Sequence, residues 1–150
     1  MNTEQKNRST ILIVDDSEMN REMLAEILKD DYDTIEAADG KEAIAAIKAH
    51  ENEIDLVLLD IVMPEMDGFE VLALMNRYKW IDSIPVIMIS AEGDFSFIKK
   101  AYDLGVTDYI QRPYQSYPIH RRIDNTLMLY NKQKRLLNIV EEQVYAKEKD

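Results

Sequence analysis

Carboxylates stand immediately after two apolar segments of the sequence. Asp15 and Asp16 follow ILIV at 11–14, and Asp60 follows LVLL at 56–59. If both runs are strands of one parallel sheet, their carboxyl ends meet at the edge where open α/β folds bind ligands. Three such carboxylates would repel one another unless a cation lies among them. Oxygen ligands at an open site suit Mg²⁺, which keeps several waters and takes few carboxylates.

A structural role competes with this interpretation for one pair of residues. Asp16 or Ser17 could simply cap the following helix, since both residue types are favoured there. Asp60 lacks that explanation because the loop IVMPEMDG follows it before the next helix begins. A carboxylate that closes a buried strand loses solvation free energy unless something offsets the loss. Asp60 is therefore a candidate for function.

Two other polar residues follow apolar segments. Ser90 comes after VIMI at 86–89, and Arg112 ends the segment DYIQR, directly before Pro113. Proline cannot continue a sheet ladder and biases the residue before it towards extended geometry. We therefore expect Arg112 at the end of a strand, facing an anion. A lone serine after a strand is more often a turn residue. Ser90 is a candidate because it follows an apolar segment, as the acids and Arg112 do.

The elements that would position these residues alternate along the chain. Short apolar runs at 11–14, 34–38, 56–59, 86–89 and 108–110 are typical of strands, and amphipathic helical segments lie between them. Three runs are too continuously apolar for a sheet with one face in water. This pattern predicts an α/β fold: a five-stranded parallel sheet, doubly wound, with helices on both faces.

The last segment has a different pattern. From Ile119 to the end there is no Gly or Pro, and apolar residues recur every seven positions at Ile123, Tyr130, Leu137 and Val144. Val140 adds one further seam position, while Thr126 and Gln133 weaken the seam. Two interpretations stay open: a fifth helix that packs on the sheet and frays beyond residue 131, or a helix that projects as a dimerising connector. We expect a polar tail at 1–8, a globular domain at 9–130 and a helical connector or tail at 131–150.

Composition limits the partners and the compartment. The 150 residues make one domain, with 46% hydrophobic residues and a net charge of −11. Residues 1–118 carry a formal charge of −13, and residues 119–150 carry +2. An acidic body repels phosphate backbones, so we expect no direct binding of nucleic acid. The absence of cysteine, of a signal peptide and of a membrane-length apolar run makes a cytoplasmic location the default expectation.

Four segments together resemble the receiver domain of two-component response regulators, over about residues 9–130. They are ILIVDDSEMNREML, LVLLDIVMPEMDGFEVL, IPVIMISA and AYDLGVTDYIQRPY. The resemblance implies that Asp60 accepts a phosphoryl group from a sensor histidine kinase or a phosphotransfer protein. It also implies Mg²⁺ held by Asp15, Asp16, Asp60 and the backbone carbonyl of Val62. Such a domain catalyses its own phosphorylation and dephosphorylation, and no metabolic reaction.

The resemblance assigns further roles around the acids. Ser90 would hydrogen-bond the phosphoryl group, and Tyr109 would be the aromatic residue whose rotation accompanies phosphorylation. Val62, Ala91, Glu92 and Pro113 would line the approach to the acyl phosphate. A phosphoryl group adds about −1.5 to −2 charge and strong acceptor oxygens, which is enough to pull Ser90 inward.

Arg112 departs from the family pattern, which has lysine before this proline. Arginine is longer, planar and forked, so the exchange is not conservative at a tight site. Arg112 either reaches the phosphoryl oxygens, even with both nitrogens, or contacts only its neighbours and slows or uncouples phosphorylation. The second outcome keeps open a phosphorylation-independent receiver that acts as a dimerisation or interaction module.

Two other classes of function fit the residues less well. A phosphohydrolase resembling the haloacid dehalogenase group needs a second Asp at position 62, where this chain has Val62. A flavodoxin-like cofactor binder needs a Ser/Thr/Gly-rich phosphate loop after the first strand, where this chain has acids. The charged helical end resembles linkers that join receivers to output domains, so we expect a longer regulator.

Overall fold

A parallel sheet forms the centre of the molecule. The computed structural model describes residues 8–91 and 93–149, and its five strands lie in the order β2-β1-β3-β4-β5. The strands are β1 (Thr10–Val14), β2 (Asp33–Ala37), β3 (Ile54–Leu59), β4 (Val86–Ser90) and β5 (Asp108–Gln111). All neighbouring strands pair in parallel. The prediction of a five-stranded, doubly wound parallel sheet is confirmed.

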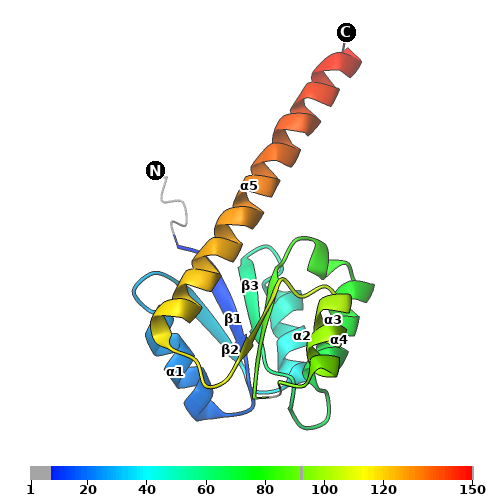
Figure 1. Cartoon of the computed structure of the whole chain (residues 1–150). Helices are drawn as coiled ribbons and strands as arrows, with labels where there is room; N and C mark the ends of the chain where they lie inside the picture. The colour runs from blue at the N-terminus through cyan, green and yellow to red at the C-terminus, as the bar shows by residue number, and fades with distance from the viewer. Residues whose placement is uncertain (1–7, 92, 150) are drawn as a thin grey trace.

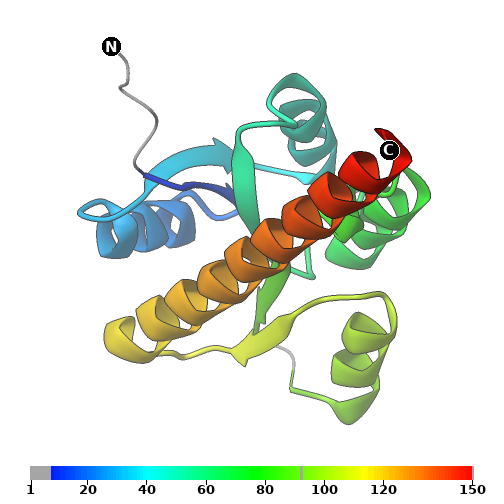
Figure 2. The same ribbon diagram turned by 90° about the horizontal axis from the view of Figure 1, so that it is seen from above.

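Helices cover both faces of this sheet (Figures 1 and 2). They are α1 (Glu18–Leu28), α2 (Gly40–Ala49), α3 (Gly68–Arg77), the short 3-10 helix η1 (Trp80–Asp82), α4 (Phe95–Asp103) and α5 (Ser116–Lys149). α1 and α5 pack on one face, and α2, α3 and α4 pack on the other. The strand order reverses between β1 and β3, which is the point where doubly wound folds place their ligands.

Alternation along each strand divides the core into two halves. In β1, Ile11 and Ile13 face α1 and α5, whereas Leu12 and Val14 face α2 and α3. All four side chains are buried. This explains why the apolar runs are continuous: both faces of the sheet exclude water.

Side-chain caps begin the first four α-helices. Ser17, Asp39, Asp67 and Asp94 each accept a hydrogen bond from a backbone N–H in the first turn of the helix that follows. Asp67 and Glu70 form a reciprocal capping box at the start of α3. At α1 the cap is Ser17 and not Asp16.

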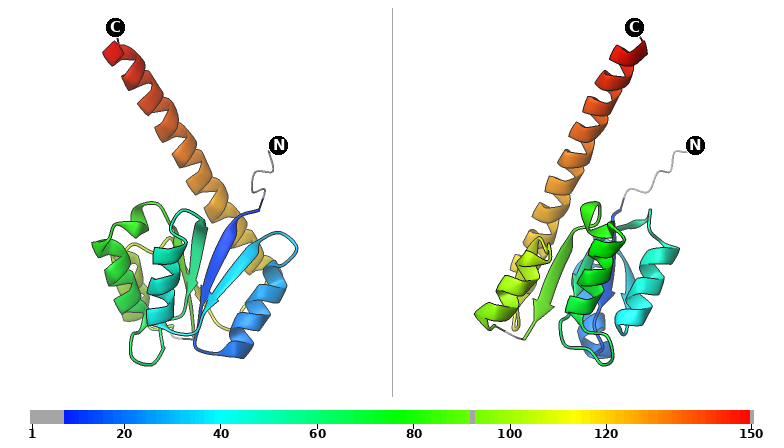
Figure 3. Two further views of the ribbon diagram at one scale, coloured as in Figure 1. Left: turned by 180° about the vertical axis from the view of Figure 1, so that it is seen from behind. Right: turned by 90° about the vertical axis from the view of Figure 1, so that its right-hand side faces the viewer.

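The last helix continues well beyond the body of the domain. Its first turns bury Ile119, Ile123 and Leu127 against the sheet, and all residues from 131 to 148 are exposed. The helix does not fray at residue 131. It leaves the body at the edge where β1 begins, opposite the edge where the strands end (Figures 1 and 3). Among the described residues no helix combines the length and the apolar character needed to cross a membrane.

Candidate functional site

The three predicted carboxylates converge at the carboxyl edge of the sheet. One carboxylate oxygen from each of Asp15, Asp16 and Asp60 lies within 4.8 Å of the others. Asp15 follows β1 and Asp60 follows β3, and these strands are neighbours. Asp15 and Asp60 are buried and Asp16 is exposed, so the group opens to solvent on one side. Clustered oxygens at an open site fit the coordination that Mg²⁺ prefers.

The backbone after β1 orients the first two acids. Ser17 caps α1 and accepts from the Asn20 N–H at 3.2 Å, so Asp16 is not needed as the cap. The Asp15 carboxylate accepts from the Ser17 N–H at 2.8 Å and from the Asn20 side-chain amide at 3.3 Å. These bonds hold Asp15 towards Asp60. Sequence reasoning missed Asn20, whose only signal was its position in the first turn of α1.

Asp60 has an unusual electrostatic environment for an aspartate. Burial and the neighbouring Asp15 carboxylate raise the pKa of Asp60 to about 6, against an opposing effect of the Arg112 guanidinium. One Asp60 oxygen accepts from the Ile61 N–H at 2.9 Å. A carboxylate with few partners in a buried position favours binding of a cation or of a compensating group.

Arg112 bridges two of the acids. Its Nη2 lies 2.5 Å from Asp15 Oδ2, and its Nη1 lies 3.5 Å from Asp60 Oδ1. The Arg112 N–H donates to the Ser90 carbonyl at 2.9 Å, which holds the arginine at the end of β5, and a cis peptide bond joins it to Pro113. Arg112 therefore faces both Asp60 and Asp15, and its shorter contact is with Asp15.

The remaining predicted residues differ in burial and in the element that carries them. Ser90 is buried at the end of β4, next to β5. Tyr109 is buried in β5 and packs in the core half that contains α2, α3 and α4. Val62, two residues after Asp60, is 60% exposed, between the buried Ile61 and Met63. Glu92 lies outside the described residues.

A pocket of about 430 Å³ lies beside the arginine. It is lined by Asn20, Met23, Ala91, Arg112, Pro113 and Tyr114. Ala91 and Pro113 thus lie next to the site, as expected. Met23 and Tyr114 were not predicted, because their contribution depends on how α1 faces the β5–α5 loop.

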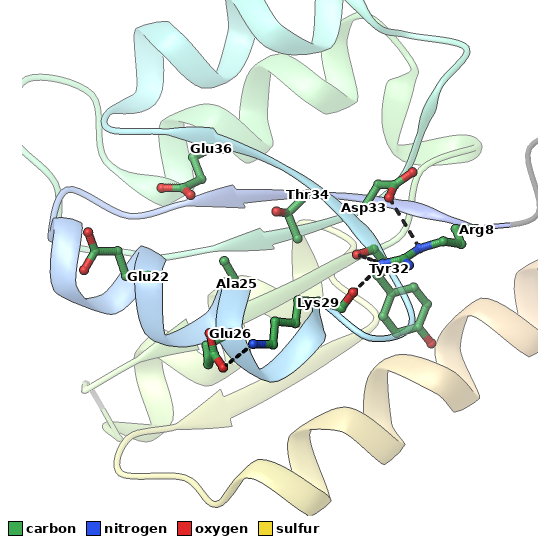
Figure 4. Close-up of a pocket in the computed structure, with 9 residues that line it drawn as sticks. All are labelled: Arg8, Glu22, Ala25, Glu26, Lys29, Tyr32, Asp33, Thr34 and Glu36. Atoms are coloured by element: carbon green, nitrogen blue, oxygen red, sulfur yellow. Dashed lines mark hydrogen bonds and ion pairs between the residues drawn. The ribbon is translucent and has the colours of Figure 1, made fainter.

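A second pocket, of about 690 Å³, lies along α1 and β2 (Figure 4). Its lining residues are Arg8, Glu22, Ala25, Glu26, Lys29, Tyr32, Asp33, Thr34 and Glu36. Its cations are paired within it: Arg8 contacts Asp33 at 3.4 Å, and Lys29 contacts Glu26 at 2.7 Å. It contains none of the acids at the strand ends.

Comparison with known proteins agrees with this geometry. A family model described as "Response regulator receiver domain" matches residues 11–124. The chain belongs to the response regulator receiver domain family. Chemotaxis protein CheY of Bacillus subtilis is 39% identical over 120 residues, which cover 78% of this chain and 96% of CheY.

Longer relatives carry the same kind of region. Hybrid signal transduction histidine kinase D of Dictyostelium discoideum is 34% identical over 132 residues, covering 87% of this chain but 8% of the kinase. Several relatives are much longer than the region that matches, and the chain spans between 8% and 54% of their length. The match therefore concerns the receiver domain alone.

One solved structure of a relative is a complex with a metal ion. The CheX-CheY-BeF3-Mg+2 complex of Borrelia burgdorferi contains a chain that is 36% identical, with a TM-score of 0.73, covering 79% of this chain and 88% of that chain. That complex holds Mg²⁺ and beryllofluoride, as its name states.

Proposed function

We propose that the chain is a phosphorylation-operated switch of a two-component pathway, with Asp60 as the phosphoryl acceptor. The observation that carries this proposal is the convergence of Asp15, Asp16 and Asp60 with one cation, Arg112, at the carboxyl edge of the sheet. Phosphoryl transfer depends mainly on positioning and on neutralising charge at the equatorial oxygens. Three acids and a fixed cation at one edge meet both requirements.

Asp15, Asp16, Asp60 and the backbone carbonyl of Val62 would hold Mg²⁺, which when bound neutralises charge on the phosphoryl oxygens. An Asp60 carboxylate oxygen attacks the phosphorus of a phosphohistidine; the new O–P bond forms as the P–N bond breaks. Arg112 stabilises the transferring oxygens by charge-assisted hydrogen bonds. The Ser90 hydroxyl donates a hydrogen bond to the phosphoryl group on Asp60, and the Tyr109 side chain rotates as this bond forms.

The partners follow from this chemistry. A sensor histidine kinase or a phosphotransfer protein would supply the phosphoryl group, and the domain would lie in the cytoplasm. The receiver would span residues 9–130, after a tail at 1–8, with residues 131–150 as a connector. Its acidic body would not bind nucleic acid directly. A second copy of the chain is proposed as a partner of the connector.

Binding of a phosphoryl mimic tests the acceptor role. Beryllofluoride with Mg²⁺ should bind the full chain and shift the amide resonances of Asp60, Ser90 and Tyr109 in heteronuclear NMR spectra. Asp60→Asn should abolish these shifts because the ligand oxygen is lost, whereas Asp30→Asn, at an exposed position, should leave them intact. Absence of shifts at millimolar Mg²⁺ in the natural sequence would contradict the proposal.

Covalent transfer provides an independent measurement. A small phosphodonor such as acetyl phosphate, with Mg²⁺, should add one phosphoryl group to the chain, detected by intact mass. The group should be missing from Asp60→Asn and present in Asp30→Asn.

A further inference from the structure

The projecting part of α5 carries an apolar stripe that is open to solvent. Leu137, Val140 and Val144 are 61%, 54% and 49% exposed. Leu137 and Val144 fall two and three heptads after Ile123, which packs against the sheet, and Val140 falls two heptads after the buried Thr126. The stripe is thus the continuation of the face by which α5 joins the body. A seam of this spacing is the geometry that pairs two helices.

Charges divide the same segment into two halves of opposite sign. Lys132, Lys134 and Arg135 precede the central apolar residues, whereas Glu141 and Glu142 follow them and outnumber the one cation in that half, Lys147. The two halves are complementary only when a second helix runs in the opposite direction. We propose that two copies of this chain pair through α5 as an antiparallel coiled coil over residues 130–147.

The antiparallel alignment gives a consistent set of seam layers. Leu137 packs against the partner's Val140, and two-fold symmetry repeats this layer, so the apolar contacts gather at the centre. Val144 then lies over the partner's Gln133. The alignment ends where Tyr130 lies opposite the partner's Lys147. Tyr130 still contacts the body of the domain there, because its hydroxyl oxygen lies 3.5 Å from Thr107 Oγ1.

Residues flanking the seam decide the direction. In the antiparallel pair, Lys134 lies beside the partner's Glu141, and symmetry makes this attractive contact twice. In a parallel pair, Lys134 would lie beside the partner's Leu129, and the two copies of Lys147 would face each other in the seam. Charges beside the seam set the orientation of coiled coils, so they favour the antiparallel pair.

The pairing leaves the acidic site accessible. α5 leaves the body at the edge opposite the strand ends that carry Asp15 and Asp60 (Figure 1). Both sites of a dimer would face away from the coiled coil. The antiparallel coiled coil specifies how two connectors pair in the dimer proposed above. This pairing does not depend on phosphorylation of Asp60.

Charge reversal in the full chain tests the pairing. By sedimentation equilibrium the natural chain should be a dimer at tens of micromolar, and Lys134→Glu and Glu141→Lys should each weaken the dimer about tenfold, because each creates two repulsive contacts. An equimolar mixture of the two variants should regain the natural affinity as a heterodimer. Arg135→Glu, which makes the same charge change on the outer face, is the matched control and should have little effect.

Cross-linking tests the direction, and the chain contains no cysteine that would interfere. Chains with Val144→Cys and Gln133→Cys, mixed and oxidised with diamide, should form the mixed disulfide. A parallel pair would instead join Val144→Cys to itself, which would overturn the orientation but not the pairing. A monomeric natural chain would overturn both, and beryllofluoride binding at Asp60 would be unaffected by either result.

Discussion

The Arg112 guanidinium is closer to Asp15 than to the proposed acceptor. Arg112 Nη2 lies 2.5 Å from Asp15 Oδ2, while the contact from Nη1 to Asp60 Oδ1 is 3.5 Å. Asp15 is one of the three carboxylates suited to hold Mg²⁺. The fixed cation and a metal ion would therefore compete for the same carboxylate. Phosphorylation would require that Arg112 release at least one Asp15 oxygen.

Removing this competition should strengthen metal binding. Arg112→Gln keeps a planar polar end group on a shorter side chain and removes the charge, so we expect Mg²⁺ to bind about tenfold more tightly by isothermal titration calorimetry. The magnitude follows from a charge-assisted hydrogen bond of about 1.5–3 kcal/mol, partly replaced by water. Phosphorylation by acetyl phosphate should nevertheless slow, because the transferring oxygens lose their cation.

Arg21→Gln provides the matched control for this experiment. Arg21 Nη1 donates to the Asp15 backbone carbonyl at 2.7 Å, and its Nε contacts Glu36 at 3.0 Å. The substitution removes an equal charge near the site without releasing the Asp15 carboxylate. Unchanged Mg²⁺ affinity in Arg112→Gln would contradict the competition.

Neutralising Asp60 should stabilise the fold at neutral pH. The folded-state pKa of Asp60 is raised to about 6, first by burial and then by Asp15, against about 3.9 in an unfolded chain. The folded state therefore binds the proton more tightly, and stability falls as pH rises from about 4 through 6. With about 1.4 kcal/mol per pKa unit, Asp60→Asn should raise the free energy of unfolding by about 2–3 kcal/mol at pH 7.5.

Urea denaturation in the presence of a chelator measures this effect. The advantage of Asp60→Asn over the natural chain should be full above pH 6 and should disappear as pH falls towards 4, because the native carboxyl is then protonated. Asp30→Asn should show no comparable pH-dependent gain. A gain that stays constant from pH 7.5 to pH 4 would mean that the Asp60 charge is not its cause.

The sheet and the position of the acids were predictable because they depend on local pattern. Continuous apolar runs such as ILIV require burial on both faces, and the residue after each run must then lie at the carboxyl edge. The positions of helix starts also depend on local sequence. At 67–68, an Asp that can cap a helix precedes a glycine that allows close packing.

Contacts between distant segments were not predictable in the same way. The preference of Arg112 for Asp15 depends on differences of about an ångström in the positions of β1, β3 and β5. Asn20 supports Asp15 only because α1 begins at a particular angle after Ser17. The continuity of α5 agrees with the absence of Gly and Pro after Pro118, but a weak heptad did not determine whether residues beyond 131 stay helical.

A polar cluster joins the start of α5 to the turn before β2, and it should contribute to stability. The Tyr32 hydroxyl donates to Asp124, and His120 contacts Asp31 at 2.9 Å and Asp124 at 3.1 Å. Tyr32→Phe removes one hydrogen-bond donor from a half-buried carboxylate and should lower the free energy of unfolding by about 1–3 kcal/mol in urea. Tyr117 is 73% exposed, so Tyr117→Phe should change the free energy of unfolding by much less. Equal effects would show that the hydroxyl bond contributes nothing specific.

Gly68 should be required for the geometry of Asp60. A Cβ at this position would overlap with the Asp60 carbonyl and lie 2.9 Å from the Ile61 Cα, both of them backbone atoms that cannot move without shifting the end of β3. Gly68→Ala should therefore destabilise the fold by about 1–3 kcal/mol and weaken Mg²⁺ binding. Gly93→Ala is the matched control, because its Cβ would meet only the flexible Gln111 side chain. Calorimetric titration and urea denaturation of both variants measure the two effects, and full Mg²⁺ affinity in Gly68→Ala would show that the loop after β3 tolerates the displacement.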